Sequence, residues 1–376
     1  MKKILLLTWT PFFKSDYKKY NLDILEKKNK IIIFDISQIL FKNFNLNKIY
    51  RKEDRIKSQS FLNIKKLIIG LKNIDIDLII NATGLEKNKS DWFGKKYNII
   101  FDTLLKKDVK IVSIIDFKNF ESLYLKIKIL SHVKYIIKYL KKIFYAKQKN
   151  DIALIGGENI DNKLKCLGRN VFYSHSFCYD YFLRERKKII TKKKTVMFID
   201  TGYGFHPDFF LIRGINKSFD INNYSKKINV LFKSFNDLGF KVYFLSHPKV
   251  KKEKQKIYKN CTIIHNNTNK YVRISDIVVT TTSSTLDLAI IYKKKILRVF
   301  SSEIEAYPEN TRNFKLGSKF FNNKFLDLDD LSNLKKKIFE NILRPGALYK
   351  KYFDIFIKHP KSHNMKFSEI IISFLK

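Results

Sequence analysis

The sequence is poor in the residues that break or cross-link a chain. Its 376 residues include only 12 glycines and 6 prolines, while 45% are hydrophobic and 15% are aromatic. Disordered chains are poor in aromatic residues and often rich in proline and glycine, so this composition excludes a disordered or low-complexity protein. The chain also exceeds the size at which a single hydrophobic core stops growing. We therefore expect two folded domains.

Cysteine is equally scarce. Cys166, Cys178 and Cys261 are odd in number and form no CxxC pair, which argues against a disulfide framework and against a zinc site. No other group of histidine, cysteine and carboxylate residues has the spacing of metal ligands, and neither a P-loop nor a Ser-His-Asp order occurs. We expect a protein of a reducing cytoplasm without a metal site.

Long hydrophobic runs are also missing, and no stretch reaches the length needed to cross a membrane. The uncharged segment 4–13 follows two lysines and superficially resembles a signal peptide. It contains Trp9 and Pro11 and lacks a cleavage site of small residues, so we interpret it as a first buried strand.

Acidic residues are few compared with basic ones. The chain has 35 Asp and Glu against 75 Lys and Arg, which gives a net charge of +40. Such a surplus attracts phosphates, acidic glycans or anionic lipid, although the abundance of Lys, Asn, Ile and Phe also fits the drift of an AT-rich genome. Because lysine is spread over every segment, we expect no nucleic-acid partner. Segment 127–144 has helical apolar spacing and a lysine face, which fits either a membrane-surface helix or a core-facing helix with a solvated face.

Short apolar runs alternate with longer amphipathic segments along the whole chain. This rhythm predicts parallel strands with crossover helices, and hence an α/β fold. A basic run from Arg184 to Lys194 marks the junction, so we expect one domain over 1–189 and another over 190–376. Polar groups after Thr8 and Ile80 would line one wall of a cleft between the domains. The predicted strands are 4–8, 30–34, 77–80, 110–115, 151–155, 170–173, 195–199, 241–245, 277–280 and 295–300.

Two motifs follow strands of the second half. His247-Pro248 comes directly after the run 241–245, and a Thr/Ser cluster turns the strand 277–280 into a helix. Ligands of open parallel sheets bind at the carboxyl ends of the strands, where helix N–H groups favour phosphate. We predict a phosphate site there, with plain helix capping by Ser284 and Asp287 as the alternative. The nucleotide-binding candidates are His247, Pro248, Thr282, Ser283, Ser284 and Thr285.

Carboxylates and a second imidazole follow the strand 195–199. Asp200, His206 and Asp208 are candidates, beside His247, for catalysis, because a carboxylate near an imidazole can act as a general base. Asp208 could equally cap the segment that follows it. Tyr179 and Asp180, near the predicted junction, are candidates for acceptor binding or for interdomain packing.

His247-Pro248 and Ser283-Ser284-Thr285 resemble the HP and S/T motifs of GT-B glycosyltransferases, in particular bacterial sialyltransferases, polysialyltransferases and Kdo transferases that use CMP-activated sugars. The stretch 198–300 is also similar to glycosyltransferases of surface-polysaccharide loci. The paired acids that precede glycine in the sialyltransferase-like families are missing, since the nearest match, Asp200-Thr201-Gly202, has one acid.

This resemblance implies two Rossmann-like parallel-sheet domains that face each other across a cleft, an acceptor-side domain first and a nucleotide-sugar-binding domain second. It also implies a metal-independent, inverting glycosyltransferase without a cofactor, which moves a sugar such as sialic acid or Kdo from a CMP-activated donor to a cell-surface glycan. His247 would contact the CMP phosphate and assist its departure, the Ser/Thr cluster would bind it, and a carboxylate would activate the acceptor.

The partners implied are a nucleotide sugar and a glycan or lipid-linked acceptor, with peripheral contact to the anionic cytoplasmic face of the membrane. A UDP-sugar transferase or a nucleotide-sugar 2-epimerase on the same fold is the alternative.

Overall fold

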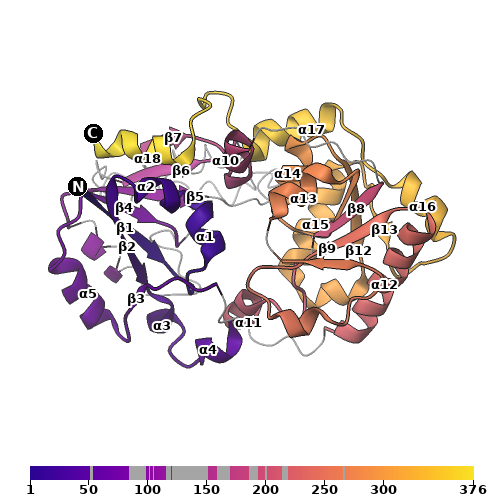
Figure 1. Ribbon diagram of the computed structural model, residues 1–376, viewed down its shortest axis with the longest axis horizontal. Helices are drawn as coiled ribbons and strands as arrows, with labels where there is room; N and C mark the ends of the chain where they lie inside the picture. Colours follow the sequence, from indigo (N-terminus) through magenta and orange to yellow (C-terminus); the bar gives the residue numbers. More distant parts are fainter. Residues whose placement is uncertain are drawn as a thin grey trace, which may run out of the picture. The chain divides into compact units, whose positions relative to one another are not determined.

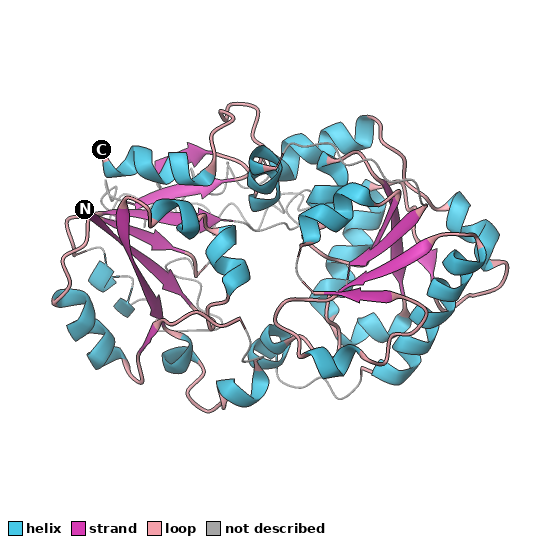
Figure 2. Cartoon of the chain, in the orientation of Figure 1, coloured by secondary structure: helices cyan, strands magenta, loops and turns pink. Residues whose placement is uncertain are grey.

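The chain folds into two α/β units, each a parallel sheet with helices against it (Figure 1, Figure 2). The computed structural model describes residues 1–50, 54–83, 99–100, 102–104, 106–115, 120, 151–158, 170–185, 194–199, 201–213, 219–265 and 267–376. The N-terminal unit comprises the described residues within 1–117 and 125–180 together with 355–376, and the C-terminal unit comprises those within 118–124 and 181–354.

The N-terminal unit is built on a seven-stranded sheet in the order β3-β2-β1-β4-β5-β6-β7. Alternate residues of the central strand β1 point to opposite faces, so Ile4 and Leu6 join one hydrophobic cluster while Leu5 and Leu7 join another. A strand that is apolar on both faces is typical of a parallel sheet covered on both sides. The strands are β1 (Lys2–Thr8), β2 (Asn29–Asp35), β3 (Gln59–Ser60), β4 (Leu78–Asn81), β5 (Lys110–Ile115), β6 (Asp151–Ile155) and β7 (Asn170–Tyr173).

Short helices connect these strands. In α5, Asn63 accepts a hydrogen bond from the backbone N–H of Lys66 and thereby caps the helix, while Leu67 and Leu71 face the core. The helices are α1 (Lys14–Lys19), α2 (Leu22–Leu25), α3 (Ser37–Leu40), α4 (Leu46–Ile49), α5 (Ile64–Lys72) and α18 (Phe367–Leu375), and α10 (Phe177–Arg184) continues into the C-terminal unit.

The C-terminal unit has a six-stranded parallel sheet in the order β10-β9-β8-β11-β12-β13. Its strands are β8 (Thr195–Ile199), β9 (Lys241–Leu245), β10 (Thr262–Ile264), β11 (Ile277–Thr280), β12 (Lys295–Phe300) and β13 (Leu326–Asp327). Its helices are α11 (Pro207–Arg213), α12 (Ile221–Asp237), α13 (Thr268–Ile274), α14 (Leu286–Ile291), α15 (Pro308–Phe320), α16 (Leu334–Glu340) and α17 (Ala347–Tyr352), and a π-helical turn (Phe353–Ile357) follows.

Both sheets have the strand order of the Rossmann fold. Counted from the first strand of each unit, the order begins 3-2-1-4-5-6 in both. The order reverses between the first and fourth strands, which are β1 and β4 in one unit and β8 and β11 in the other. Ligands of such folds bind outside the carboxyl ends of the strands at this switch point.

The helix α12 shows how the sequence specifies its own boundaries. The Asp220 side chain accepts hydrogen bonds from the backbone N–H groups of Asn222 and Asn223, both at 3.0 Å, and so satisfies donors that a helix leaves free. Apolar residues at helical spacing then face the core, among them Ile228, which is fully buried. The helix ends at Asp237, and Gly239 follows with a φ of +79°, the left-handed conformation that favours glycine just after a helix.

The predicted strands are confirmed, with 77–80 shifted by one residue to Leu78–Asn81. The three short strands β3, β10 and β13 were not predicted. The sequence pattern also predicts helices over 228–238, 331–343 and 367–376, and these correspond to α12, α16 and α18. Segment 127–144 and Cys166 lie outside the described residues. Within the described ranges no helix is both long and apolar enough to cross a membrane.

The unit boundaries differ from those expected at 189 and 190. The division falls between Asp180 and Tyr181, and 355–376 returns to the N-terminal unit. The carboxylate of Asp180 binds the first backbone N–H of α18, at Phe367, and the side chains of Ile370 and Ile371 enter the core beside β1. Burial of this apolar face explains why the last helix packs against the first unit.

Candidate functional site

The residues singled out in the second half lie around three neighbouring strands of the C-terminal unit. β8 pairs in parallel with β9 on one side and with β11 on the other. The loop 201–206 follows β8, His247 follows β9, and the Thr/Ser cluster follows β11. Since the carboxyl ends of parallel strands meet at one edge of a sheet, the three segments converge at the switch point.

Two imidazoles face each other at this edge. The Nε2 atoms of His206 and His247 are 3.1 Å apart, and the two ring centroids are separated by 4.1 Å with a tilt of 47°. His206 also stacks on Phe209, with 4.6 Å between the ring centroids. Both histidines are half-buried, so the pair is packed from one side and accessible in part.

Each imidazole belongs to a His-Pro-X turn. The backbone N–H of Asp208 donates to Nδ1 of His206 at 3.1 Å, and that of Lys249 donates to Nδ1 of His247 at 3.3 Å. The third residues of the two turns are themselves ion-paired, because Lys249 Nζ lies 2.8 Å from Asp208 Oδ2. The two turns therefore lie together at two points, at their imidazole rings and at the ion pair of their third residues.

The surroundings keep both imidazoles neutral at pH 7. Burial lowers the pKa of His206 to about 4, although the Asp208 carboxylate opposes this. Burial also lowers the pKa of His247 well below its usual value, helped by repulsion from His206 and Lys249. A neutral imidazole carries one N–H donor and one acceptor nitrogen.

Hydroxyl groups join the loop after β8 to the cluster after β11. Thr201 Oγ1 lies 2.7 Å from Thr281 Oγ1, and the Tyr203 hydroxyl lies 2.6 Å from Thr282 Oγ1. Asn310 donates to the Tyr203 hydroxyl at 3.2 Å. Tyr203 is fully buried, and burial raises the pKa of its hydroxyl, so it stays protonated. The loop 201–206 thus connects the imidazole pair to this hydroxyl cluster, which consists of Thr201, Tyr203, Thr281 and Thr282.

This loop depends on two glycines with positive φ. Gly202 and Gly204 both have φ near +76°, a region that side chains with a Cβ rarely adopt. A Cβ on Gly204 would lie 3.0 Å from the Phe219 ring, and its backbone N–H donates to the Tyr307 hydroxyl. The sharp turn brings Thr201 and Tyr203 to the hydroxyl cluster and His206 to His247.

The capping alternative for Ser284 and Asp287 is not what the structure forms. Helix α14 begins after Thr285, whose side chain makes no capping hydrogen bond, and the Thr285 N–H donates to Ser283 Oγ at 3.2 Å. Asp287 is fully buried and accepts instead from the Tyr352 hydroxyl at 3.1 Å. Ser284 is exposed, and Pro248 is exposed beside the imidazole pair.

The remaining predicted site residues fall elsewhere. Asp200 lies outside the described residues. Asp180 is fully buried in the N-terminal unit, where its two oxygens accept from Phe367 N–H and from Asn21 Nδ2. The Tyr179 hydroxyl donates to Asn364 at 3.0 Å. These contacts tie the C-terminal segment to the N-terminal unit, and an acceptor role for Tyr179 and Asp180 stays a prediction.

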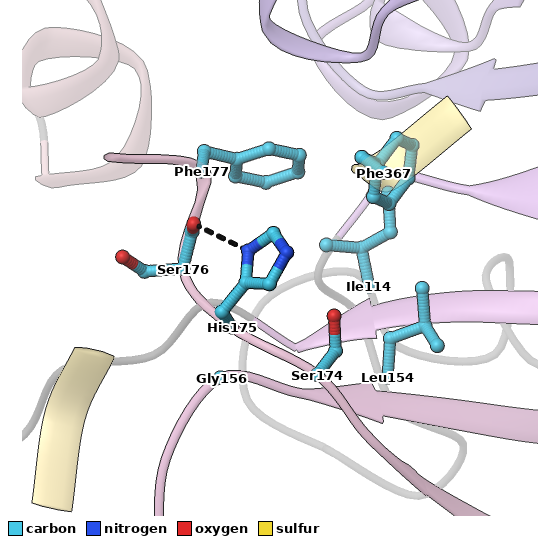
Figure 3. Close-up of a pocket in the computed structure, with 8 residues that line it drawn as sticks. All are labelled: Ile114, Leu154, Gly156, Ser174, His175, Ser176, Phe177 and Phe367. Carbon is cyan, nitrogen blue, oxygen red and sulfur yellow. Dashed lines mark hydrogen bonds between the residues drawn. The ribbon is translucent and has the colours of Figure 1, made fainter. Parts of the chain in front are cut away.

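The N-terminal unit has a small pocket at the carboxyl ends of β5, β6 and β7 (Figure 3). His175 lines it beside the rings of Phe177 and Phe367, with Nδ1 3.1 Å from the Ser176 carbonyl oxygen and Nε2 2.6 Å from that of Met365. A Cβ on Gly156 would lie 2.9 Å from Ser176 N, and one on Gly157 would lie 2.3 Å from the Ile355 carbonyl oxygen. Close packing therefore accounts for the paired glycines.

Several site residues were missed from the sequence. No sequence motif predicts the contacts made by Thr201, Tyr203, Lys249 and Asn310. The one available signal is the position of Lys249 directly after His247-Pro248. Among the residues with described positions, no group of three or more histidine, cysteine or acidic side chains could hold a metal ion.

No protein-family model matches the chain, and no curated protein matches its sequence. Solved structures with a similar fold include Arabidopsis thaliana UGT89C1 in complex with UDP, which is 10% identical with a TM-score of 0.52 over 100% of both chains. A candidate UDP-N-acetylglucosamine 2-epimerase from Listeria monocytogenes is 10% identical with a TM-score of 0.50, over 100% of this chain and 96% of that one. Such likeness concerns the fold alone, and it confirms two parallel-sheet α/β domains.

Proposed function

We propose that this protein is a glycosyltransferase that binds a nucleotide sugar in its C-terminal unit. The observation that carries this proposal is the convergence of His247, the hydroxyl cluster and the loop after β8 at the switch point of a Rossmann-type sheet. N–H and O–H donors gathered at this point suit a phosphate group. The fold and the HP and S/T motifs agree with this assignment.

In the proposed reaction, an acceptor hydroxyl attacks the anomeric carbon of the donor sugar as the bond to the nucleotide phosphate breaks. The departing phosphate gains negative charge, which preorganised donors stabilise more in the transition state than in the ground state. His247 donates a hydrogen bond to it, and Ser283, Ser284 and Thr285 hold the phosphate or the nucleotide. Lys249 adds positive charge next to His247, although it is shared with Asp208.

The acceptor hydroxyl loses its proton to a carboxylate. Asp208 is already held by Lys249 at 2.8 Å, so the stronger candidate is Asp200, which directly follows β8 in the sequence. Attack from the side opposite the leaving phosphate inverts the anomeric carbon, and the proposed reaction uses no metal ion or further cofactor.

We propose a CMP-activated donor, such as CMP-sialic acid or CMP-Kdo, because the HP and S/T motifs resemble those of transferases for CMP-sugars. A UDP-sugar transferase or a nucleotide-sugar 2-epimerase is the second candidate. It is favoured by the fold's likeness to a structure in complex with UDP and to a candidate UDP-N-acetylglucosamine 2-epimerase.

Thermal shift with a nucleotide panel tests the proposal. A ligand that binds only the folded protein raises its free energy of unfolding by about 2.7 kcal/mol at a concentration of 100 Kd. We expect CMP to raise the melting temperature more than UMP, UDP and GMP do at equal concentration. A larger shift with UDP would favour the second candidate, a UDP-sugar transferase or a 2-epimerase. No shift with any nucleotide would refute nucleotide-sugar binding.

We further propose that the acceptor is a cell-surface glycan, free or lipid-linked, and that the enzyme works in the cytoplasm at the inner face of the membrane. The net charge of +40 supports contact with anionic lipid. Sedimentation with vesicles of phosphatidylglycerol, compared with vesicles of phosphatidylcholine, tests this contact. Equal binding to both at low and high salt would contradict it.

A further inference from the structure

The tautomers of His206 and His247 follow from their turns. A backbone amide can only donate, so an Nδ1 that receives one has to be the bare acceptor nitrogen. The N–H groups of Asp208 and Lys249 therefore place the proton of each neutral ring on Nε2.

A third His-Pro-X turn supports this rule. In His359-Pro360-Lys361, at the C-terminal end of the chain, the backbone N–H of Lys361 also donates to Nδ1 of His359, at 3.1 Å. Three turns at separate places in the chain thus show the same bond. The placement of the ring proton is a property of the local sequence and does not depend on the site.

Two Nε2–H donors consequently point at each other across 3.1 Å. Two N–H groups repel at that distance, because each hydrogen needs a lone pair on the opposite atom. The nearby Asp208 carboxylate could accept these hydrogen bonds only by weakening its ion pair with Lys249, which lies 2.8 Å away. An oxygen with several lone pairs, placed against both nitrogens, would accept from both at once.

We propose that His206 and His247 together donate through Nε2–H to one phosphate oxygen, so that His206 is a second phosphate-binding residue and not a general base. This inference rests on the proposed function for the nucleotide, but its chemistry concerns any phosphate. Neither ring has a lone pair left to accept a proton, because each Nδ1 is already bonded to the backbone. A base in this reaction has to come from a carboxylate.

Binding measurements on the full chain test the pair, with CMP and UMP each compared with their nucleosides cytidine and uridine. His206→Phe keeps an aromatic ring against Phe209 but removes the donor. A hydrogen bond to a charged group is strong enough that its loss should weaken binding of the better nucleotide about tenfold or more. Binding of the nucleoside should stay unchanged, and His206→Gln, which restores an N–H donor, should recover part of the loss.

His359→Phe is the matched control, because it makes the same change in a His-Pro-X turn of the N-terminal unit, and it should leave nucleotide binding unchanged. If His206→Phe binds the nucleotide as tightly as the wild-type protein does, the two-donor arrangement is wrong while the proposed function stands. If the wild-type protein binds none of CMP, UMP and UDP, the proposed function fails instead.

Nitrogen NMR of histidine-labelled wild-type protein with inorganic phosphate decides the pair independently of any nucleotide. We expect both rings as Nε2–H tautomers, with the two Nε2–H protons shifting downfield as phosphate is added. A ring found with its proton on Nδ1 in the phosphate-bound protein, or no response to phosphate, would overturn the inference.

Discussion

The two units share a strand order, yet polar residues at or near the carboxyl ends of their strands behave differently. In the N-terminal unit, Asn81 at the end of β4 donates to Ser113 of the neighbouring β5 at 3.3 Å and accepts from Thr83 at 2.7 Å, and all three are buried. In the C-terminal unit the corresponding edge holds two half-buried imidazoles whose donors face each other.

Topology therefore decides where a site can form, and local chemistry decides whether its groups are available. A buried polar group that is satisfied by its neighbours contributes to stability and has little left for a ligand. Groups whose donors have no suitable acceptor gain more from binding one. Substitutions at the two edges should accordingly separate loss of function from loss of stability.

The largest effect should come from His247→Ala. Removing one preorganised donor to a developing oxyanion typically costs about 10²–10³-fold in rate, so we expect transfer from the sugar nucleotide selected by the panel to fall by that factor. Ser113→Ala, at the opposite unit's edge, should change the rate less than threefold while lowering the melting temperature. Wild-type turnover of the His247→Ala enzyme would show that the strand ends of the C-terminal unit do not carry the proposed function.

Asp180→Ala should produce the opposite pattern. Two donors, Phe367 N–H and Asn21 Nδ2, would lose their buried acceptor, and we expect the free energy of unfolding to fall by about 2–4 kcal/mol. Fluorescence of Trp9 during urea unfolding reports this loss, since Trp9 belongs to the N-terminal unit. CMP binding below the unfolding transition should stay within twofold of the wild-type value. A large rise in the KM for the acceptor in the folded variant, with CMP binding unchanged, would instead support the predicted acceptor role.

The sequence predicts the central strands well because each of them is a run of at least four residues, most of which are apolar. It misses β3, β10 and β13, which contain two, three and two residues and lie at sheet edges. Edge strands this short are defined by pairing with a neighbour and carry little pattern of their own. The return of α18 to the N-terminal unit is missed for a similar reason, because an apolar helix face does not specify which sheet it will cover.

Within the candidate site, the sequence identifies motifs but not their connections. His206 and His247 are both visible as His-Pro pairs, yet their contact depends on the parallel pairing of β8 with β9. The Thr/Ser run suggests a phosphate site, whereas its bonds to Thr201 and Tyr203 require the turn set by Gly202 and Gly204. Long-range register, which no local pattern encodes, supplies these links.

Acid should weaken the C-terminal unit selectively. The pKa of His206 is about 4 in the folded protein and near 6.5 when unfolded, so the unfolded chain takes up the proton first. Its contribution to stability is complete above about pH 6.5 and is lost progressively as the pH falls toward 4. Asp208, Lys249 and His247 surround the ring, and the Asp208 carboxylate limits the loss.

We expect the free energy of unfolding to drop by about 1–2 kcal/mol between pH 7 and pH 5, after allowance for partial solvent screening. Calorimetric unfolding of the wild-type protein and of His206→Phe measures this. The variant should show a smaller drop, because it lacks the titrating ring. An equal drop in both proteins would assign the acid sensitivity to other groups.

The smallest structural effect should accompany Ser284→Ala. The side chain is exposed and α14 begins without a side-chain cap, so the free energy of unfolding should change by less than about 0.5 kcal/mol. A capping serine would instead cost about 1 kcal/mol when replaced by alanine. If Ser284 contacts phosphate, CMP should bind about tenfold more weakly to the variant while cytidine binds equally well. Unchanged CMP binding together with unchanged stability would leave Ser284 outside the phosphate site, and the Thr/Ser cluster would then act through Thr282, Ser283 and Thr285.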